Sequence, residues 1–482
     1  MVTTPNDTDK YKDVVLNLNK EPILTPEEEE IRKSYVRKID ARILPVVVML
    51  YFASSLDRGN IGVAMIHGLV ERLKLSNVDQ GNVVAVFTVF YLIFEAPANM
   101  ILKKWKPRYW FTLIVTGWSL STFYLAYAHT ANLFIFGRVL VGTFEAGFTP
   151  GIVAYLSYWY TKTELASRMG TFFLALPLSG MIGGPIAGAL VQTSLFEYKY
   201  QSVFFVEGLI TIGIGLLAFF TIYDYPETSN FFTKEEHELV VRRITADEGL
   251  ASEAKISRKH TIAAFTDWKI YVLSIAGFGP GNGLGLIGFA GPTIIQSMGY
   301  SPTDATYMAG IPYACSVVAM LIVMPFYDRI KFWKSYVLAA PVNIFGCILV
   351  AFTKRPEIRL YGLCLVGIAS CPVIPIGMTW VASNCGSVSK RMISTAIYTT
   401  LTGLSGLLTP YMFVRKYAPD YLIGYIFKIV MQIMSLIAAL TLYAYFFKEN
   451  TRRDANPVDV SHLSTEEQRD MNDKHPDFRY RI

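Results

Sequence analysis

Long apolar stretches recur along this 482-residue sequence and limit what the chain can fold into. An α-helix needs about 20 apolar residues to cross the roughly 30 Å of hydrocarbon in a bilayer. Inside that layer every backbone amide must find a partner within the protein, so only helices and closed barrels can cross it. Stretches of this length occupy residues 43–66, 81–102, 109–128, 132–159, 169–192, 202–222, 270–295, 304–327, 335–353, 359–383, 392–414 and 421–447. The sequence therefore predicts an all-α polytopic membrane protein with twelve transmembrane helices.

The composition agrees with a membrane protein, since 52% of the residues are hydrophobic and only 17% are charged. The net charge of +6 comes from Lys and Arg in short loops rather than from one basic domain, so we expect no nucleic-acid partner. The five cysteines lie in or beside apolar stretches without CxxC spacing, which is typical of packing residues. We expect no metal and no cofactor.

One long connection divides the twelve stretches into two groups of six. Residues 41–222 are expected to form an N-terminal bundle and residues 270–447 a C-terminal bundle, joined by a cytoplasmic central loop at 223–269. Residues 1–40 and 448–482 form a cytoplasmic arm and a cytoplasmic tail. Lys and Arg are more frequent in the loops on the side of both chain ends, and the positive-inside rule places that side in the cytoplasm.

Two polar segments outside the membrane are expected to begin helices. Residues 25–28 and 233–236 each start with a threonine and carry a glutamate three residues later, which is the pattern of a capping box. After the second box, Leu239, Val240 and Ile244 stand among charged residues. This pattern predicts an amphipathic helix that lies on the inner membrane surface.

Four charged residues stand inside predicted membrane helices. Asp57 and Arg58 are adjacent within 43–66, and Arg138 and Glu145 lie seven residues apart in the fourth helix. A separation of two helical turns places the latter two on one face. A charge at membrane depth costs roughly 2.5 to 3.5 kcal/mol on insertion scales, so it persists only against other protein or a wet cavity. All four residues are candidates for a functional site.

Other polar residues in or near the helices have less demanding explanations. Glu95 and Asn99 lie one turn apart near the cytoplasmic end of the second helix, where we expect gating or structural roles, with a proton site as the alternative for Glu95. Glu207 opens the sixth helix near the outside, and the same two explanations apply to it. Lys428 can extend its ammonium to the membrane surface. His67 falls in an outside loop and gives no strong indication of function.

Glycines mark two helices of interest. Gly180, Gly184 and Gly188 recur every four residues in the fifth helix, a spacing that lets membrane helices approach closely. Residues 277–285 of the seventh helix contain five glycines and a proline, too many for a straight rod. Broken helices persist at membrane depth where their backbone lines a cavity. Asn282 in this stretch is therefore a candidate for substrate contact, and a hinge without a ligand is the alternative.

The two groups of helices also carry related loops. A basic cluster at 103–108 follows the second helix, and Asp328 and Arg329 follow the eighth at the equivalent place. These loops resemble the cytoplasmic loop signature of the major facilitator superfamily, whose halves are repeats that enclose one midplane site. The resemblance implies a gating role for Asp328 and Arg329. A plain basic loop set by the positive-inside rule is the alternative, and the first copy lacks the aspartate.

A more specific resemblance extends along nearly the whole chain. Its motifs are DRGNIG at 57–62, FEAPAN at 94–99, GR followed by EAGFTPG within 137–151, and YWY followed by E within 158–164. Together, and in this order on the expected helices, they resemble the fungal allantoate permease branch of the anion:cation symporters. That family takes up small organic anions, including nicotinate, pantothenate, biotin and nitrogen or sulfur compounds such as allantoate, usually with protons.

The resemblance implies roles for the four charged residues in the membrane. Asp57 and Glu145 match the acids that carry protons in the wider family. Arg58 and Arg138 match its substrate-orienting arginines. Gly59 departs from the family pattern, because relatives usually carry Ser or a similar residue at this position.

We therefore expect a monomeric proton-coupled symporter that moves a small organic anion across a fungal plasma membrane by alternating access. Intramembrane acids occur in the first half, so coupling is expected there, and Asn282 and Tyr398 of the second half are expected to contact substrate. A nutrient receptor with this fold and a uniporter or exchanger of organic anions are the alternatives. The endoplasmic reticulum and the vacuolar membrane are alternative locations. We do not expect this protein to be an enzyme, since neither the cysteines nor the six histidines provide a nucleophile or a metal cluster.

Overall fold

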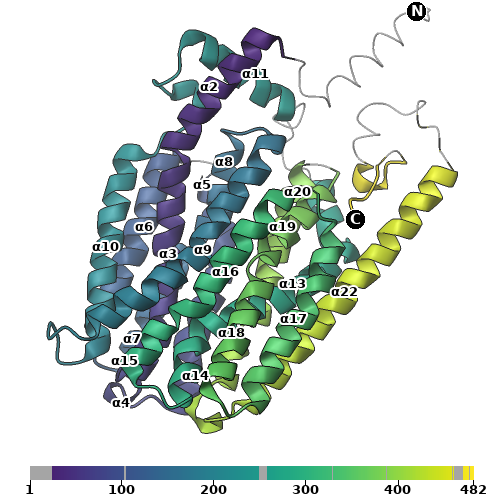
Figure 1. Ribbon diagram of the computed structural model, residues 1–482. Helices are drawn as coiled ribbons and strands as arrows, with labels where there is room; N and C mark the ends of the chain where they lie inside the picture. Colours follow the sequence, from purple (N-terminus) through teal and green to yellow (C-terminus); the bar gives the residue numbers. More distant parts are fainter. Residues whose placement is uncertain are drawn as a thin grey trace, which may run out of the picture.

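The computed structural model describes residues 24–102, 105–248, 258–327, 329–386, 388–456, 458, 460, 471–476 and 478–482. Long helices run side by side through the described part of the chain, and both of its ends lie at the same end of the bundle (Figure 1). We call this the terminal end and the opposite one the far end. The predicted all-α architecture is confirmed.

Twelve helical crossings in the described residues match the twelve predicted stretches. The N-terminal half contains α3 (Leu44–Ile66), α5 (Asn77–Leu102), α6 (Pro107–Leu125), α7 (Ala131–Glu145) with α8 (Phe148–Ser157), α9 (Lys162–Leu190) and α10 (Lys199–Thr221). The C-terminal half contains α13 (Trp268–Gly285), a π-helical turn (Leu286–Ala290) and α14 (Gly291–Ser297), then α15 (Pro302–Met308) with α16 (Gly310–Val323), α17 (Phe332–Phe352), α18 (Pro356–Ser370) with α19 (Val373–Ser383), α20 (Val388–Ser405) with α21 (Thr409–Met412), and α22 (Leu422–Ala455).

Ten helices of the described chain are long and apolar enough to cross a membrane by length and composition alone. The two crossings that fall short are α6 and α20, because each contains too many polar residues: α6 carries Arg108 with several serines and threonines, and α20 carries Lys390, Arg391 and four threonines. Both helices nevertheless run alongside the others through the bundle (Figure 1). In α6 the neighbouring helices bury Ser119, Ser121 and Thr122.

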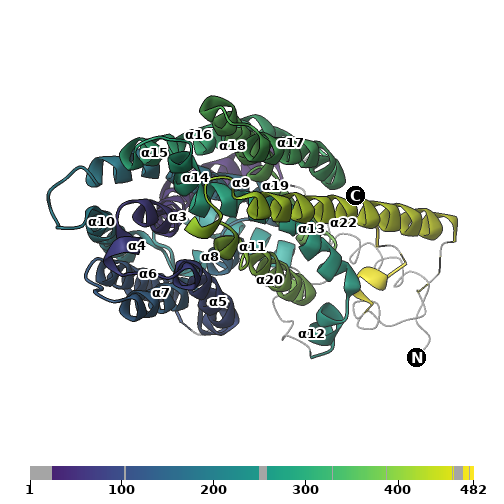
Figure 2. The ribbon, with the colours of Figure 1, turned by 90° about the horizontal axis from the view of Figure 1, so that it is seen from below.

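The two halves repeat one packing scheme. In the N-terminal half α3 packs on α9 and α10, α5 on α7, and α6 on α7 and α10. In the C-terminal half α13 packs on α20 and α22, α16 on α18, and α17 on α18 and α22, so each contact has a counterpart. Between the halves, α9 meets α15 and α16, and α5 meets α20 and α21 (Figure 2). α3 also meets the π-helical turn and α14, which continue α13, so a site between the halves is bordered by the first crossing of each repeat.

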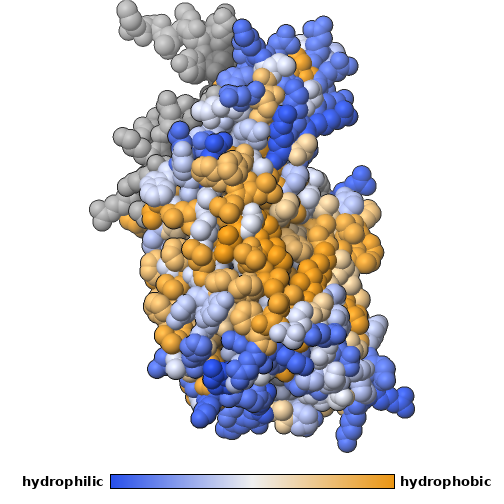
Figure 3. Space-filling model, turned by 90° about the vertical axis from the view of Figure 1, so that its left-hand side faces the viewer, coloured by the Kyte–Doolittle hydropathy of each residue, from blue (hydrophilic) through white to orange (hydrophobic). Residues whose placement is uncertain are grey.

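A belt of apolar side chains covers the middle of the visible face, and hydrophilic residues gather above and below it (Figure 3). Large apolar residues such as Phe220 and Leu338 are mostly exposed, at 77% and 69%. Such a continuous apolar surface is compatible with a lipid bilayer rather than with water.

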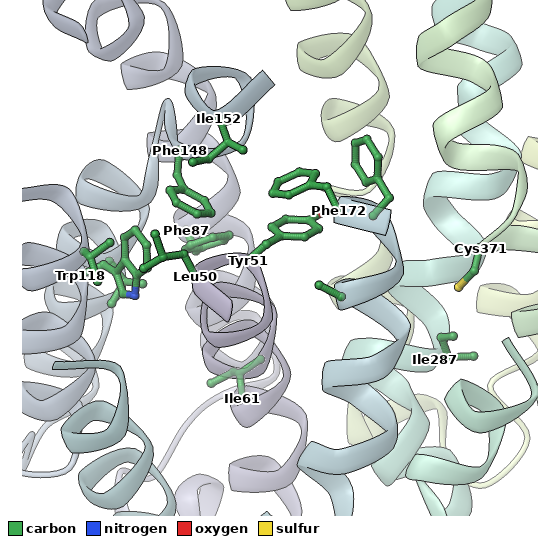
Figure 4. Packing of buried hydrophobic residues seen from close by; sticks show 14 of the residues in the cluster. Leu50, Tyr51, Ile61, Phe87, Trp118, Phe148, Ile152, Phe172, Ile287 and Cys371 are labelled. Atoms are coloured by element: carbon green, nitrogen blue, oxygen red, sulfur yellow. The ribbon is translucent and has the colours of Figure 1, made fainter. Parts of the chain in front are cut away.

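Aromatic rings fill the interior between the helices (Figure 4). Tyr51 of α3 stacks on Phe172 of α9, with ring centroids 4.3 Å apart. Trp118 of α6 meets the edge of Phe148 in α8 at 5.1 Å. The helix is interrupted between α7 and α8 at Gly147. The φ of this residue is +76°, a left-handed conformation that favours glycine.

The helices outside the membrane form a cap at the terminal end. α2 (Pro26–Arg42) continues almost directly into α3, and α11 (Lys234–Glu248) packs against α2 (Figure 1). Both predicted capping boxes are present. Leu239 and Val240 are buried, and Glu236 accepts hydrogen bonds from Ser34 and Lys38 of α2. The predicted position of α11 on the membrane surface is wrong, because its apolar face packs on α2 above the bundle.

The described residues of the segment 471–482 are docked on the C-terminal half at the same end. The buried carboxylate of Asp473 binds Lys269 at the start of α13, at 2.9 Å, and Lys390 at the start of α20, at 2.5 Å. Tyr480 stacks on Phe446 of α22 at 4.6 Å. The side-chain amide of Asn384 exchanges two hydrogen bonds with the backbone of Arg481. This segment therefore holds together helices that are far apart in the sequence.

Candidate functional site

An ion pair lies in the middle of the N-terminal half. Arg58 of α3 donates from Nε to Oε1 of Glu145, the last residue of α7, at 2.7 Å. Ser54, one turn before Arg58, donates its hydroxyl to the same oxygen. Glu145 is fully buried, whereas the Arg58 side chain is 32% exposed. The pair therefore has a buried acid and a base that a solute can still reach.

Aromatic rings surround the two arginines. The Arg58 guanidinium lies 5.0 Å from the ring centroid of Tyr91 and 5.5 Å from that of Phe87. Arg138 lies over Phe87 at 4.9 Å and donates from Nε to the backbone carbonyl of Val83 at 2.8 Å. Arg138 and Glu145 share the buried face of α7, as predicted, but the ionic partner of Glu145 is Arg58 on another helix. Phe87 of α5 thus lies against both cations.

Asp57 points away from Arg58, since adjacent residues are about 100° apart around a helix. It is 3% exposed and its Oδ2 accepts from the Thr211 hydroxyl of α10 at 3.3 Å. Glu207, one turn before Thr211, is fully buried at the same interface. The expectation that Glu207 lies close to a hydrated surface is wrong. The sequence did indicate this depth, because Glu207 lies eight residues into α10, about 12 Å from the helix start.

Asn282 is the centre of a separate polar cluster in the C-terminal half. Its amide nitrogen donates to Ser405 at 2.8 Å, and its side-chain oxygen accepts from Thr409 at 2.8 Å. Lys428 of α22 donates to the backbone carbonyl of Asn282 and approaches its side-chain oxygen. Lys428 is only 3% exposed, so the prediction that it extends to the membrane surface is wrong. The helix start at Leu422 is about 9 Å away along the axis, whereas the backbone and side-chain oxygens of Asn282 lie within reach of the ammonium.

Tyr398, the second predicted contact in this half, is buried in α20. Its hydroxyl lies against Gly277 of α13 and Gly377 of α19. Among the described residues, no hydrogen bond, ion pair or ring contact joins Asn282 or Tyr398 to Arg58 or Glu145. The structure thus brings together the N-terminal candidates and leaves these two in the other half.

The predicted gating residues lie in different settings. Glu95 of α5 accepts from Thr399 at 3.1 Å and approaches Thr400 at 3.5 Å, both on α20, so it joins the two halves. Arg329 is exposed after α16, and Asp328 lies outside the described residues. Asn99 belongs to α5, but its side chain also lies outside the described part.

The three spaced glycines are at the contact between α9 and the C-terminal half. A Cβ on Gly184 would lie 2.9 Å from the carbonyl oxygen of Thr306, and one on Gly188 would lie 2.9 Å from the Tyr307 ring. A Cβ on Gly180 would overlap the ring of Tyr313. The close approach that their spacing predicts is present, and it joins the halves rather than helices of one half.

Polar contacts close the far end between the two halves. His67 meets the hydroxyl of Thr306 at 2.8 Å, and Gln192 donates to the Tyr307 hydroxyl at 2.9 Å. Asn82 accepts from Tyr411 at 2.8 Å, and Arg415 binds Glu71 at 2.5 Å. These contacts therefore resist separation of the halves at this end.

The sequence and the fold match known membrane proteins. Residues 47–410 match the family model described as Major Facilitator Superfamily. An uncharacterized transporter of Schizosaccharomyces pombe is 28% identical over 93% of this chain and 90% of its own length. A protein of Agrobacterium vitis described as a putative tartrate transporter is 32% identical over 62% of this chain and 66% of its own length.

The fold is similar to that of the xylose transporter XylE from E. coli in a partially occluded inward-open conformation, with a TM-score of 0.64. The match covers 83% of this chain and 97% of the other, at 14% identity. At this identity the likeness concerns the fold alone.

Proposed function

This chain belongs to the major facilitator superfamily, and from that premise we propose that it is a proton-coupled symporter of a small organic anion that works by alternating access. One observation carries the proposal: the ion pair between Arg58 and Glu145 has a cation that is about one-third exposed and a fully buried acid. Transport within this superfamily uses one site between two repeated halves. Arg58 is on α3, the first helix of its repeat, where such a site is bordered.

An anion that binds Arg58 has to compete with Glu145. A guanidinium can hold a carboxylate through two parallel hydrogen bonds, and Arg58 now uses its Nε on Glu145. Once released, the buried carboxylate of Glu145 keeps only the hydroxyl of Ser54, and an unpaired charge at this depth is costly. Proton uptake removes that cost, so anion and proton bind cooperatively, and linkage makes the effect reciprocal.

The substrate that fits this site is a carboxylate with an apolar or aromatic body. The rings of Tyr91 and Phe87 beside Arg58 offer such a surface. The description of the Agrobacterium vitis relatives as putative tartrate transporters supports an organic acid. Nicotinate, pantothenate, biotin and allantoate remain the substrates that the motif resemblance favours.

The proposed cycle exchanges the far-end closure for closure at the terminal end. We place the terminal end in the cytoplasm, as the positive-inside rule favours, and the protein in the plasma membrane. The contacts of His67 and Arg415 then form an outer gate, and the contact of Glu95 with Thr399 belongs to the inner gate. Opening the outer gate requires breaking the polar contacts between the halves.

Uptake into proteoliposomes tests the proposal. Vesicles that contain the purified protein are given an inward proton gradient and labelled nicotinate, pantothenate, biotin, allantoate or tartrate. We expect one of these anions to accumulate, and a protonophore to abolish accumulation. Glu145→Gln is expected to exchange that anion without concentrating it. Accumulation by Glu145→Gln with unchanged pH dependence would refute the coupling role of Glu145, and no uptake of any organic anion would refute the function.

A further inference from the structure

Glu207 is a buried carboxyl group that the proposed exchange at Arg58 does not use. It lies in α10 and is 0% exposed. Neither of its carboxylate oxygens makes a hydrogen bond of normal geometry among the described residues, although the amide of Asn60 lies close enough to interact with it. An acid in the membrane interior without a donor is costly as an anion, whereas the neutral acid can stay and can itself donate a hydrogen bond.

The packing of α3 on α10 brings Glu207 to Asp57. Glu207 and Thr211 are four residues apart and share one face of α10, and Thr211 donates to Asp57 at 3.3 Å. Asn60 lies three residues after Asp57 on the same face of α3 and is buried as well. Oδ1 of Asp57 and the amide nitrogen of Asn60 lack hydrogen-bond partners in the described structure. Two carboxyl groups and an amide therefore meet in one closed interface.

Acids outnumber the cations near this interface. Arg58 is bound to Glu145, and Arg138 donates to the carbonyl of Val83 while it interacts electrostatically with both Glu145 and Asp57. Two arginines thus face three carboxyl groups. From the elements packed on α10, the ionisable side chain that faces this interface is Asp57 of α3. α6 contributes Trp118, and α9 carries no ionisable residue beyond Arg168 near its terminal-end start. At least one of the two carboxyls must therefore hold a proton.

The C-terminal half makes the same interface without acids. α13 and α22 correspond to α3 and α10 in the repeated packing. Their facing polar residues are Asn282 and Lys428, which hydrogen-bond to one another. A proton-holding pair at this place is thus a property of the N-terminal half.

We propose that Asp57 and Glu207 form a two-carboxyl site whose ligand is the transported proton. One proton remains on the pair, and a second binds to the remaining carboxylate and is released from it during the cycle. This inference rests on the proposed proton coupling and adds a second acid to Asp57. Glu207 is a residue that holds the proton itself and not a support for the substrate.

Infrared difference spectroscopy of the full-length protein in lipid nanodiscs measures protonated carboxyls directly and needs no substrate. We expect a carboxylic-acid carbonyl band that changes in amplitude between pH 5 and pH 8. Glu207→Gln is expected to abolish it. The matched control is Glu197→Gln, which changes an exposed acid just before α10 and is expected to leave the band intact. Asp57→Asn should leave a Glu207 band that no longer responds to pH in this range.

Labelling the wild-type protein with carbon-13 glutamate should shift the band, which tests the assignment even if Glu207→Gln does not fold. A band that is unchanged in Glu207→Gln, or one that does not respond to pH in the wild type, overturns the inference. Either result is compatible with proton-driven uptake through Glu145. Failure of the proposed function itself would appear as absent anion uptake and would leave the spectroscopic outcome unaffected.

Discussion

At the scale of single residues, the side chain that each charged residue contacts determines the role we propose for it. Arg58 and Asp57 are adjacent in the sequence, yet Arg58 binds Glu145 and Asp57 meets Thr211. The difference arises because adjacent side chains leave a helix in different directions, so each belongs to a separate interface. In the proposed cycle Arg58 therefore binds the anion, whereas Asp57 holds a proton.

Replacing Arg58 by lysine is expected to lower uptake about tenfold to a hundredfold, since an ammonium keeps the charge but cannot make two parallel hydrogen bonds to a carboxylate. The measurement is the initial rate of proton-driven anion uptake at equal protein abundance. Arg355→Lys changes an exposed arginine and is the control. Wild-type kinetics in Arg58→Lys would remove Arg58 from the anion site.

His67 is expected to make the far-end closure sensitive to pH. Burial and the nearby Lys199 ammonium lower the pKa of His67 to about 4, while a hydrated histidine titrates near 6.5. The closed state binds the proton less well, so its stability falls as the pH drops below about 6.5 and stops falling below about 4. Between pH 7 and pH 5 the ratio of open to closed protein should rise roughly twentyfold.

The distance between spin labels at Leu195 and Lys354, which lie at the far ends of the two halves, measures this opening. His67→Gln keeps a donor for Thr306 but cannot be protonated, and is expected to lose the pH response. An equal response in His67→Gln would assign it to another group.

At the scale of helices, α9 supplies much of the contact between the two halves. Its glycines place the backbone of α9 directly against α15 and α16. Such contacts are favourable in one arrangement and are lost entirely in another, which suits a switch between two states.

Gly184→Ala is expected to destabilise the far-end closed state by about 1 to 3 kcal/mol, because the added methyl group meets backbone atoms of Thr306 and Gly310. The label pair at Leu195 and Lys354 should then report a larger open population. Gly213→Ala in α10 has nothing within 4 Å of the new Cβ and should behave as the wild type. If Gly184→Ala shows the same closed population as the wild type, α16 can move aside for the added methyl group without a cost in free energy, and the prediction is wrong.

At the scale of the whole molecule, residues 471–482 link the terminal-end segments of α13, α19, α20 and α22. Burial alone would raise the pKa of Asp473, but the ammonium groups of Lys269 and Lys390 outweigh it and lower the pKa to about 2. Its stabilising charge is therefore complete above pH 4 and is lost only as the pH falls through about 2. Asp473 therefore keeps its charge, and its ion pairs with Lys269 and Lys390, at physiological pH.

Asp473→Asn is expected to lower the free energy of unfolding by about 3 kcal/mol, because Lys269 and Lys390 then share the single carboxylate of Asp267 and one buried positive charge is left without a partner. The loss, measured by thermal unfolding in detergent, should be the same at pH 5 and pH 8. Asp454→Asn removes an ion pair whose carboxylate is 66% exposed and should cost less than about 1 kcal/mol. Equal effects of the two changes would show that the docked segment adds little stability.

The sequence alone determined the twelve crossings and the presence of a polar site in the first half. An apolar run of membrane length has few other ways to fold, and a charge within it is too costly to be accidental. The capping boxes before α2 and α11 were equally predictable, because all their atoms lie within four residues.

Only the tertiary structure decided which of these residues meet. Glu145 faces Arg58 rather than Arg138, Lys428 turns inward to Asn282, and Glu207 lies beside Asp57 through the packing of α3 on α10. Each partner comes from a helix dozens to more than a hundred residues away. Such pairing depends on helix rotation and neighbour order, which result from the summed packing of all twelve helices rather than from any local pattern.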